Sequence, residues 1–474
     1  MFSFYSFFIG LYFLCIANCC SGLFHIYPKI NDYPIQGGFG DDPGLPLILT
    51  PLIKAKKIQE ARVACKMTPM KSNISSYAGF FTVDPAYNSN MFFWFFPAYQ
   101  NNASAPVILW LQGGPGATSL YGLFAEHGPF SVKRKHGLKL REYTWTHDHN
   151  VIYIDNPVGT GFSFTNADGY VKNEAEVGKH LYSALYQFFT LFPEYQKNDF
   201  FVTGESYAGK YVPSTAYAIH NLNKQAEIKI NLKGVAIGNG LCDPEHMMQY
   251  GNYLYQIGLL DSNGRNLFLK KEQEIVKSIQ QKNWKSAFNQ FDALLNGDLT
   301  NGTSIFKTLT GFSFYFNYLY NQDYSTYGDM GRFLSNVNIR KNLHVGNATF
   351  HVEAVDVEKN LIEDIMQSVK PTIEFLLNAN YRVLIYNGQL DIIVAFPLTE
   401  SFVDALNWNG AQDYKVAQRK QWFVGKELAG YSRVARNLNV VLVRNAGHMV
   451  PMDQPKWSVD LISRFTRGKP FSVS

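Results

Sequence analysis

The chain has 474 residues, of which 46% are hydrophobic, so it can bury a substantial core within one large domain or two to three ordinary ones. Its 43 basic and 38 acidic residues give a formal net charge of +5, and no block of like charges interrupts the sequence. This near balance argues against nucleic acid or an anionic membrane surface as a partner.

The N-terminal stretch MFSFYSFFIGLYFLCIANCCSG is uncharged, is apolar for about 17 residues and ends in small residues. The pattern predicts a secretory signal over residues 1–22 that is cleaved after Gly22. Because the start lacks basic residues, a retained anchor is the alternative. No other stretch is apolar enough and long enough to span a bilayer, so we expect no membrane anchor after cleavage and a secreted or lysosomal protein.

Two further features bear on the secretory route. N-glycosylation sequons begin at four asparagines, Asn73, Asn102, Asn301 and Asn347. Beyond the predicted signal the chain keeps only Cys65 and Cys242. These two cysteines could form one disulfide in an oxidising compartment or remain as two unpaired buried thiols.

The first elements after the signal are a helix and a hairpin. LIKAKKIQEARVAC, residues 52–65, has helical spacing. YAGFFTV and MFFWFFPA are joined by the turn-rich DPAYNSN, which predicts an antiparallel hairpin over residues 77–98.

Short apolar runs that end in polar or glycine-rich loops follow the hairpin. They are PVILWLQGGPG, NVIYIDNPVGTG, NDFFVTGES and LKGVAIGNG, and two more, YRVLIYNGQLD and NVVLVRNAGH, lie near the C-terminus. Unbroken apolar runs are typical of strands buried on both faces of a parallel sheet. Residues 171–192 have helical spacing between two such runs, so the order is strand, helix, strand. The sequence therefore predicts an α/β fold.

The rhythm of strands fails between residues 244 and 342. Ile275, Val276 and Ile279 form one helical stripe, and a second consists of Trp284, Ala287, Phe288, Phe291, Leu294 and Leu295. Residues 312–327 are aromatic and strand-like or looped, and we interpret them as core rather than as the lining of a substrate cleft. We expect residues 23–243 and 343–474 to form one sheet domain, with residues 244–342 as a mainly helical insertion.

Three strand ends carry Ser206, Asp391 and His448, in that order. A neutral serine is a poor nucleophile, so a histidine must take its proton, and a carboxylate must orient the ring and stabilise the imidazolium. Ligands of open parallel sheets bind beyond the carboxyl ends of the strands. Ser206 lies in GESYA, one small residue from the Gly-x-Ser-x-Gly pattern of a nucleophile elbow, and alanine is small enough for the second position. This order of serine, acid and histidine is the one found in α/β-hydrolases.

An oxyanion hole is also required. Gly113 and Gly114 directly follow a predicted strand, and glycine lets backbone N–H groups approach a carbonyl oxygen. The residue after the nucleophile, Tyr207, supplies the second N–H. A plain Gly-Pro turn is the alternative interpretation.

Six ordered motifs carry a resemblance to a known family. They are WLQGGPGATS, GLFAEHGPF, YIDNPVGTGFSF, VTGESYAGKYVP, YNGQLD and NAGHMVPMDQP, and together they resemble the serine carboxypeptidases. SNMFFWFFPA and VKNEAEVGKH make the vitellogenic-like branch the most similar. The likeness runs from about Tyr77 to the C-terminus. It implies an α/β-hydrolase fold, with a mostly parallel central sheet, helices on both faces and a mainly helical insertion.

The resemblance also assigns residues to roles. It makes Ser206, Asp391 and His448 the triad, and Gly114 and Tyr207 the oxyanion donors. Trp110, Gln112, Glu126 and Glu205 correspond to the family's site for the terminal carboxylate of the substrate, and Met449 would line the pocket for the departing residue. Position 112 is more often asparagine and position 117 is often cysteine, whereas this chain has Gln112 and Ala117.

We therefore expect a serine-type carboxypeptidase that acts on peptides or proteins with a free C-terminus, without a metal or cofactor, at acidic pH. His147 and His149 are a metal-site candidate, but no third ligand has a telling spacing, so we interpret them as a solvated loop. The alternatives are an acyltransferase or esterase on the same fold, or a catalytically inactive secreted binding protein.

Overall fold

The computed structural model describes residues 35–36, 42–99, 104–133, 137–299, 302–322 and 327–472. The predicted signal and the sequons at Asn102 and Asn301 lie outside these residues. Within the described ranges, no helix is both long enough and apolar enough to cross a membrane.

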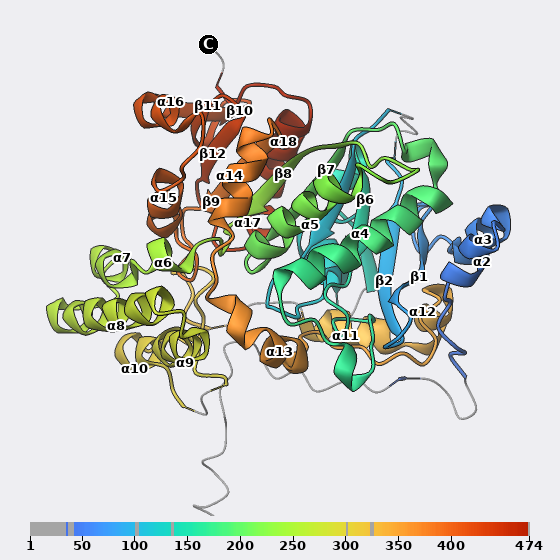
Figure 1. Cartoon of the computed structure of the whole chain (residues 1–474), viewed down its shortest axis with the longest axis horizontal. Coiled ribbons are helices and arrows are strands. Elements are labelled where there is room, and N and C mark those ends of the chain that lie inside the picture. Colours follow the sequence, from blue (N-terminus) through green and yellow to red (C-terminus); the bar gives the residue numbers. More distant parts are fainter. Residues whose placement is uncertain are drawn as a thin grey trace, which may run out of the picture.

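A ten-stranded sheet runs through the molecule in the order β1-β2-β6-β3-β7-β8-β9-β12-β11-β10 (Figure 1). The six strands from β6 to β12 in this order are parallel, and the pairs at either side are antiparallel. The strands are β1 (Tyr77–Asp84), β2 (Ser89–Phe96), β3 (Val107–Leu111), β6 (Asn150–Ile154), β7 (Phe200–Glu205), β8 (Leu232–Gly238), β9 (Arg382–Gly388), β10 (Lys420–Val424), β11 (Glu427–Ala435) and β12 (Leu438–Val443). The predicted hairpin and parallel sheet are confirmed.

Helices cover both faces of the sheet. In β7, Phe200 packs against Phe189 of α4 (Glu174–Leu191), whereas the next residue, Phe201, packs against Phe465 of α18 (Pro455–Thr466). Successive side chains of a strand point to opposite faces, so α4 and α18 lie on opposite sides. Helices α5 (Ala208–Leu222) and α14 (Lys370–Asn378) contact β7, β8 and β9. Every residue of β3, β6 and β7 is consequently buried, which explains their unbroken apolar runs.

Helices dominate the chain between β8 and β9. They are α6 (Pro244–Met247), α7 (Tyr250–Gln256), α8 (Ser262–Gln280), α9 (Trp284–Leu295), α10 (Ile305–Thr310), α11 (Tyr327–Ser335), α12 (Val337–Asn342), α13 (Val355–Ile365) and α14. The two predicted stripes lie on α8 and α9, which pack against each other. Helices α6 to α10 gather at one side of the molecule (Figure 1). The boundaries of the insertion at residues 244 and 342 stay a prediction.

The remaining elements are short. They are α2 (Thr50–Lys54), α3 (Ile58–Cys65), η1 (Gly122–His127), β4 (Phe130–Lys133), β5 (Gly137–Leu140), η2 (Trp145–His147), η3 (Ala167–Gly169), η4 (Pro193–Tyr195), α15 (Phe396–Asp404), α16 (Ala411–Val416) and α17 (Val450–Asp453). The single helix expected over residues 52–65 is wrong. Lys56 has a left-handed backbone, with φ of 57°, and this ends α2 before α3 begins.

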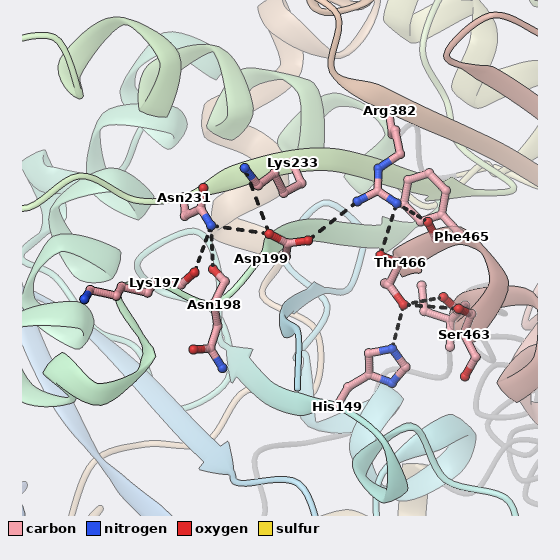
Figure 2. Close-up of polar contacts among 11 residues, drawn as sticks. His149, Lys197, Asn198, Asp199, Asn231, Lys233, Arg382, Ser463, Phe465 and Thr466 are labelled. Atoms are coloured by element: carbon pink, nitrogen blue, oxygen red, sulfur yellow. Dashed lines mark hydrogen bonds and ion pairs between the residues drawn. The ribbon is translucent and has the colours of Figure 1, made fainter. Parts of the chain in front are cut away.

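The amino edge of the sheet is held by a polar cluster (Figure 2). Arg382, the first residue of β9, donates to the carbonyl oxygens of Phe465 at 2.8 Å and Thr466 at 3.1 Å, at the end of α18. Its guanidinium also lies 3.9 Å from Asp199, which in turn lies 4.0 Å from Lys233. Through these hydrogen bonds, Arg382 connects the last turn of α18 to the first residue of β9 in the sheet.

His149 belongs to the same cluster. Its Nε2 lies 2.8 Å from the Thr466 hydroxyl (Figure 2). Its Nδ1 lies 3.3 Å from the Trp145 carbonyl oxygen. The ring is completely buried, and burial lowers the pKa of His149 to about 3. The interpretation as a solvated loop is therefore wrong for His149, whereas His147 is exposed.

We predict that Arg382→Met lowers the free energy of unfolding by about 1–3 kcal/mol, because two carbonyl oxygens at the end of α18 lose their donor. Chemical denaturation measures the change. Lys233→Met is the matched control: it removes the other, largely exposed partner of Asp199, and we expect a loss below about 0.5 kcal/mol. Equal losses in the two variants would contradict the role given to Arg382.

Candidate active site

The central parallel strands share a carboxyl edge, and a polar side chain follows each of them. They are Gln112 after β3, Asp155 after β6, Ser206 after β7, Asn239 after β8, Asp391 after β9 and His448 after β12. This edge is opposite to the one that carries the Arg382 cluster. It is the edge at which open α/β sheets hold their ligands.

Ser206 sits on a sharp turn between β7 and α5. Its backbone is left-handed, with φ of 63°, which is strained for a serine. A Cβ on Gly204 would lie 2.7 Å from Cβ of Ala208 and 2.5 Å from the Leu111 carbonyl oxygen. The turn therefore tolerates alanine at position 208 because position 204 is glycine. Similarly, a Cβ on Gly113 would lie 2.7 Å from Cβ of Ser206, so the loop after β3 can approach the turn only through glycine.

Asp391 and His448 form a buried pair. The distance between Asp391 Oδ2 and His448 Nδ1 is 2.8 Å, and the two residues are 0% and 2% exposed. A carboxylate only accepts hydrogen bonds, so Nδ1 carries the proton and Nε2 is left as the acceptor. Within the described part of the chain, His448 Nε2 has no hydrogen-bond partner. The pair therefore presents an unprotonated ring nitrogen suited to a general base.

Two residues that sequence reasoning did not single out hold this pair. Asn239 Nδ2 donates to Asp391 Oδ2 at 2.7 Å, and Asn239 Oδ1 accepts from the Gly388 amide at 3.1 Å. The Phe316 ring stacks on the His448 ring at 4.8 Å, and its carbonyl oxygen accepts from the His448 amide. Asn239 ends the predicted strand in GVAIGNG, so its place at a strand end was the available signal. For Phe316 the available signal was the aromatic stretch of residues 312–327, which we interpreted as core rather than as the lining of a substrate cleft.

Asp155 holds the loop that carries the predicted oxyanion donor. Thr118 Oγ1 and the Ser119 amide donate to Asp155 Oδ1 at 2.6 and 3.0 Å, and the Phe162 amide donates to Oδ2 at 2.8 Å. Gly114, a few residues before Thr118, lines one cavity together with Ser206 and Tyr207. Asp155 also ends a predicted strand, in YIDNPVG, but nothing in the pattern indicated its partners.

The four residues assigned to the terminal carboxylate lie together and are buried. Trp110 Nε1 donates to Gln112 Oε1 at 3.0 Å, and Gln112 Nε2 donates to Glu205 Oε1 at 2.7 Å. Glu126 comes from a turn of π-helix, η1, and lies next to Glu205 and Gln112. Trp110 is completely buried in β3, so it supports Gln112 from behind. Glutamine is longer than the asparagine that is more often found at this position, and the Gln112 side chain spans the gap between the Trp110 indole and the Glu205 carboxyl group.

The electrostatics of this group are unusual. Burial raises the pKa of both Glu126 and Glu205, and the proximity of Glu126 raises that of Glu205 further. The contacts of Glu126 with Glu205 and Gln112, and then the charge of Arg141, lower the pKa of Glu126, whereas the charge of Asp453 raises it. Two close, buried carboxyl groups cannot both ionise cheaply, so the pair retains a proton. A protonated glutamic acid can donate a hydrogen bond to an anion.

Other expected residues lie as follows. Met449 is 4% exposed and directly precedes α17, and it does not line the cavity beside Ser206. From the aromatic stretch, Phe314, Tyr315 and Phe316 are buried, and Tyr315 also lines that cavity.

Cys65 and Cys242 are unpaired and buried. The described residues contain no group of three or more histidine, cysteine, aspartate or glutamate side chains able to hold a metal ion.

Comparison with known proteins adds independent evidence. The family model for serine carboxypeptidases matches residues 67–468. A venom serine carboxypeptidase from Apis mellifera is 57% identical over 464 residues, covering 97% of this chain and 99% of its own. A probable serine carboxypeptidase from Homo sapiens, CPVL, is 50% identical over 462 residues and 96% of each chain.

A solved structure has the same architecture. The prohormone-processing carboxypeptidase KEX1 of Saccharomyces cerevisiae superposes with a TM-score of 0.74 and 25% identity, over 86% of this chain and 96% of its own. This likeness confirms the α/β-hydrolase fold. From its motifs, its strand-end residues and these similarities, we conclude that the chain belongs to the serine carboxypeptidase family.

Proposed function

We propose that this serine-type carboxypeptidase releases the C-terminal residue of peptides through an acyl-enzyme formed on Ser206. The observation that carries the proposal is the 2.8 Å contact between Asp391 and His448, at the same sheet edge as the strained turn of Ser206. A binding or storage role would need none of these three side chains. A nucleophile, a base and an acid at one edge fit acyl transfer instead.

In the proposed cycle, Ser206 Oγ attacks the carbonyl carbon of the last peptide bond while His448 Nε2 accepts the hydroxyl proton. Asp391 stabilises the resulting imidazolium, and the amides of Gly114 and Tyr207 donate to the oxyanion. His448 then gives the proton to the departing amine, which breaks the C–N bond. Water hydrolyses the remaining ester by the same steps in reverse.

The group formed by Gln112, Glu126 and Glu205 would bind the free carboxylate of the substrate, with Trp110 behind Gln112. A shared proton on the two glutamates supplies a donor and removes one repelling charge. Met449 would line the pocket for the departing residue. The proposed substrate is therefore a peptide or protein with a free C-terminus, and the proposed working pH is acidic.

We also infer that the protein follows the secretory route to a secreted or lysosomal location. The apolar N-terminus supports this, as does the similarity to a venom protein. Asn73 and Asn347 are exposed and so accessible to glycosylation, and Asn102 and Asn301 are proposed on their sequons alone.

We predict that Ser206→Ala and His448→Ala each reduce kcat by about 10⁴-fold or more, with the double variant little worse than either, because both changes break one unit. Peptide hydrolysis and labelling by a fluorophosphonate measure the loss. Ser214→Ala, on the same helix α5, is the control and should label normally. Additive losses in the double variant would argue against a shared mechanism.

We predict that amidation of the peptide C-terminus lowers kcat/KM by about 10- to 100-fold, since charge-assisted hydrogen bonds to the carboxylate are lost. Mass spectrometry of paired peptides measures the ratio, and acetylation of the N-terminus serves as the control. Cleavage of internal bonds at equal rates would show that no carboxylate site operates.

We predict that KM for peptides is low at acidic and neutral pH and rises as the pH passes about 8. Burial raises the pKa of Glu126 to about 8 and that of Glu205 well above its usual value, so the pair is protonated at acidic and neutral pH and loses its proton at higher pH. The additional negative charge then repels the substrate carboxylate.

The measurement compares KM against pH for a peptide and its C-terminal amide, in the wild type and in Glu126→Gln/Glu205→Gln. The amide and the double variant should show a flat KM. A rise of equal size in the double variant would rule out the glutamate pair as its cause.

A further inference from the structure

A cavity opens beside Ser206, and the residues that line it do not include Glu126 or Glu205. Gly114, Ser206 and Tyr207 form its catalytic end. Its apolar walls are Leu241, Tyr250, Phe288, Phe291, Ile365 and Ile393. Of the residues assigned to the terminal carboxylate and the departing residue, none lines it. If the last residue of the peptide lies toward Gln112 and Glu205, this cavity faces the residue on the acyl side of the bond.

Three carboxyl groups line the same cavity: Asp298, Glu353 and Glu358. Asp298 follows α9, and Glu358 lies on α13, which packs against α9. Glu353 pairs with Ala117 in an isolated bridge, and the next amide, of Ala354, donates to the Gly116 carbonyl oxygen at 2.9 Å. The loop after Gly114 therefore holds one of the carboxyl groups close to the predicted oxyanion donor.

Among the described residues, those that line this cavity include no lysine, arginine or histidine. Lys359, next to Glu358, has its Nζ 3.3 Å from Asp356, and its charge lowers the pKa of Glu358 to a smaller extent than burial raises it. Burial raises the pKa of Glu353 and Glu358, and carboxyl groups nearby raise both further. Burial, with Asp292 close by, also raises the pKa of Asp298 to about 7.

Unsatisfied oxygens point to a missing partner. Tyr207 is only 2% exposed, and its hydroxyl has no hydrogen-bond partner among the described residues. The same holds for Asn296 Oδ1 and Asp298 Oδ1, and all three residues line the cavity. Buried polar atoms are nearly always paired, so a ligand with several donors would complete this group.

We propose that this cavity binds the side chain of the penultimate residue of the peptide and that it selects a basic side chain, lysine or arginine. The assignment rests on the proposed function, because it takes Ser206 as the nucleophile. The aromatic and aliphatic walls of the cavity pack against the methylene groups of the substrate's lysine or arginine. Such side chains commonly bury their methylene groups on apolar surface while the charged end contacts polar groups. Asp298, Glu353 and Glu358 hold the cation, and its positive charge favours the ionised form of carboxyl groups that burial otherwise keeps neutral. Tyr207 and Asn296 offer further oxygens.

The test uses N-acetylated peptides that end in Xaa-Leu, where Xaa is lysine, norleucine or glutamate. Norleucine keeps the stem of lysine and lacks the charge. For the wild type we expect kcat/KM for lysine to exceed that for norleucine by about tenfold or more, and glutamate to be slower than norleucine. In Glu353→Gln/Glu358→Gln the ratio of lysine to norleucine should fall to within about twofold of one.

Glu363→Gln is the matched control, because Glu363 is an exposed residue of the same helix α13. It should keep the wild-type ratio. A ratio of two substrates does not depend on the fraction of folded enzyme, so a destabilised variant still gives an answer. Equal or better cleavage of the norleucine peptide by the wild type, or an unchanged ratio in the double variant, would overturn the proposal.

The outcomes also separate this inference from the one on which it rests. If no peptide of the series loses leucine, the proposed function fails and the basic preference fails with it. If the norleucine peptide is cleaved and lysine brings no gain, the carboxypeptidase assignment stands and the basic preference alone is wrong.

Discussion

The left-handed backbone of Ser206 is the steric constraint on which the neighbouring segments depend. The turn brings β3, β7 and α5 so close that Gly113 and Gly204 have no room for a Cβ. Main-chain bonds hold the strain: the Ser206 amide donates to Gly238 at 3.0 Å, and the Leu241 amide donates to Ser206 at 3.0 Å. The same end of β8 supplies Asn239, which holds Asp391. The position of the serine is thus tied, through one strand end, to the acid that orients His448.

Buried acids surround this turn, and they differ in their partners. Asp391 has two hydrogen-bond donors, His448 and Asn239. The pKa of Glu205, directly before Ser206, is raised mainly by burial and further by Glu126 and Asp391. A neutral Glu205 therefore adds no negative charge beside Asp391. On the proposed model, the two ends of the site have the same kind of side chain and opposite tasks: the glutamate pair accepts an anion, and the cavity carboxyl groups accept a cation.

Much of the fold was predictable because its strands are buried on both faces. β3, β6, β7, β8, β9 and β12 read as apolar runs that end in polar loops, and the ends of the runs pointed to Ser206, Asp391 and His448. Strands β10 and β11 were missed because they lie at the sheet's edge with half-exposed residues and no unbroken run. The helix over residues 52–65 was placed as one unit because its apolar spacing hides the left-handed Lys56. The burial of His149 depends on α18, more than 300 residues away, which no local pattern encodes.

The unpaired state of Cys65 and Cys242 affects how the protein becomes inactivated after it unfolds. Both thiols are buried, and burial raises their pKa, to about 12 for Cys65, so in the native state they react slowly. Neither links distant parts of the chain, so the unfolded ensemble keeps its full conformational entropy. In an oxidising compartment, an opened molecule exposes two thiols that can couple to other chains. Because such coupling is irreversible, inactivation of the protein on heating would be governed by its unfolding rate rather than by the equilibrium between folded and unfolded states. The half-life of the folded protein would then depend on the redox state of the medium.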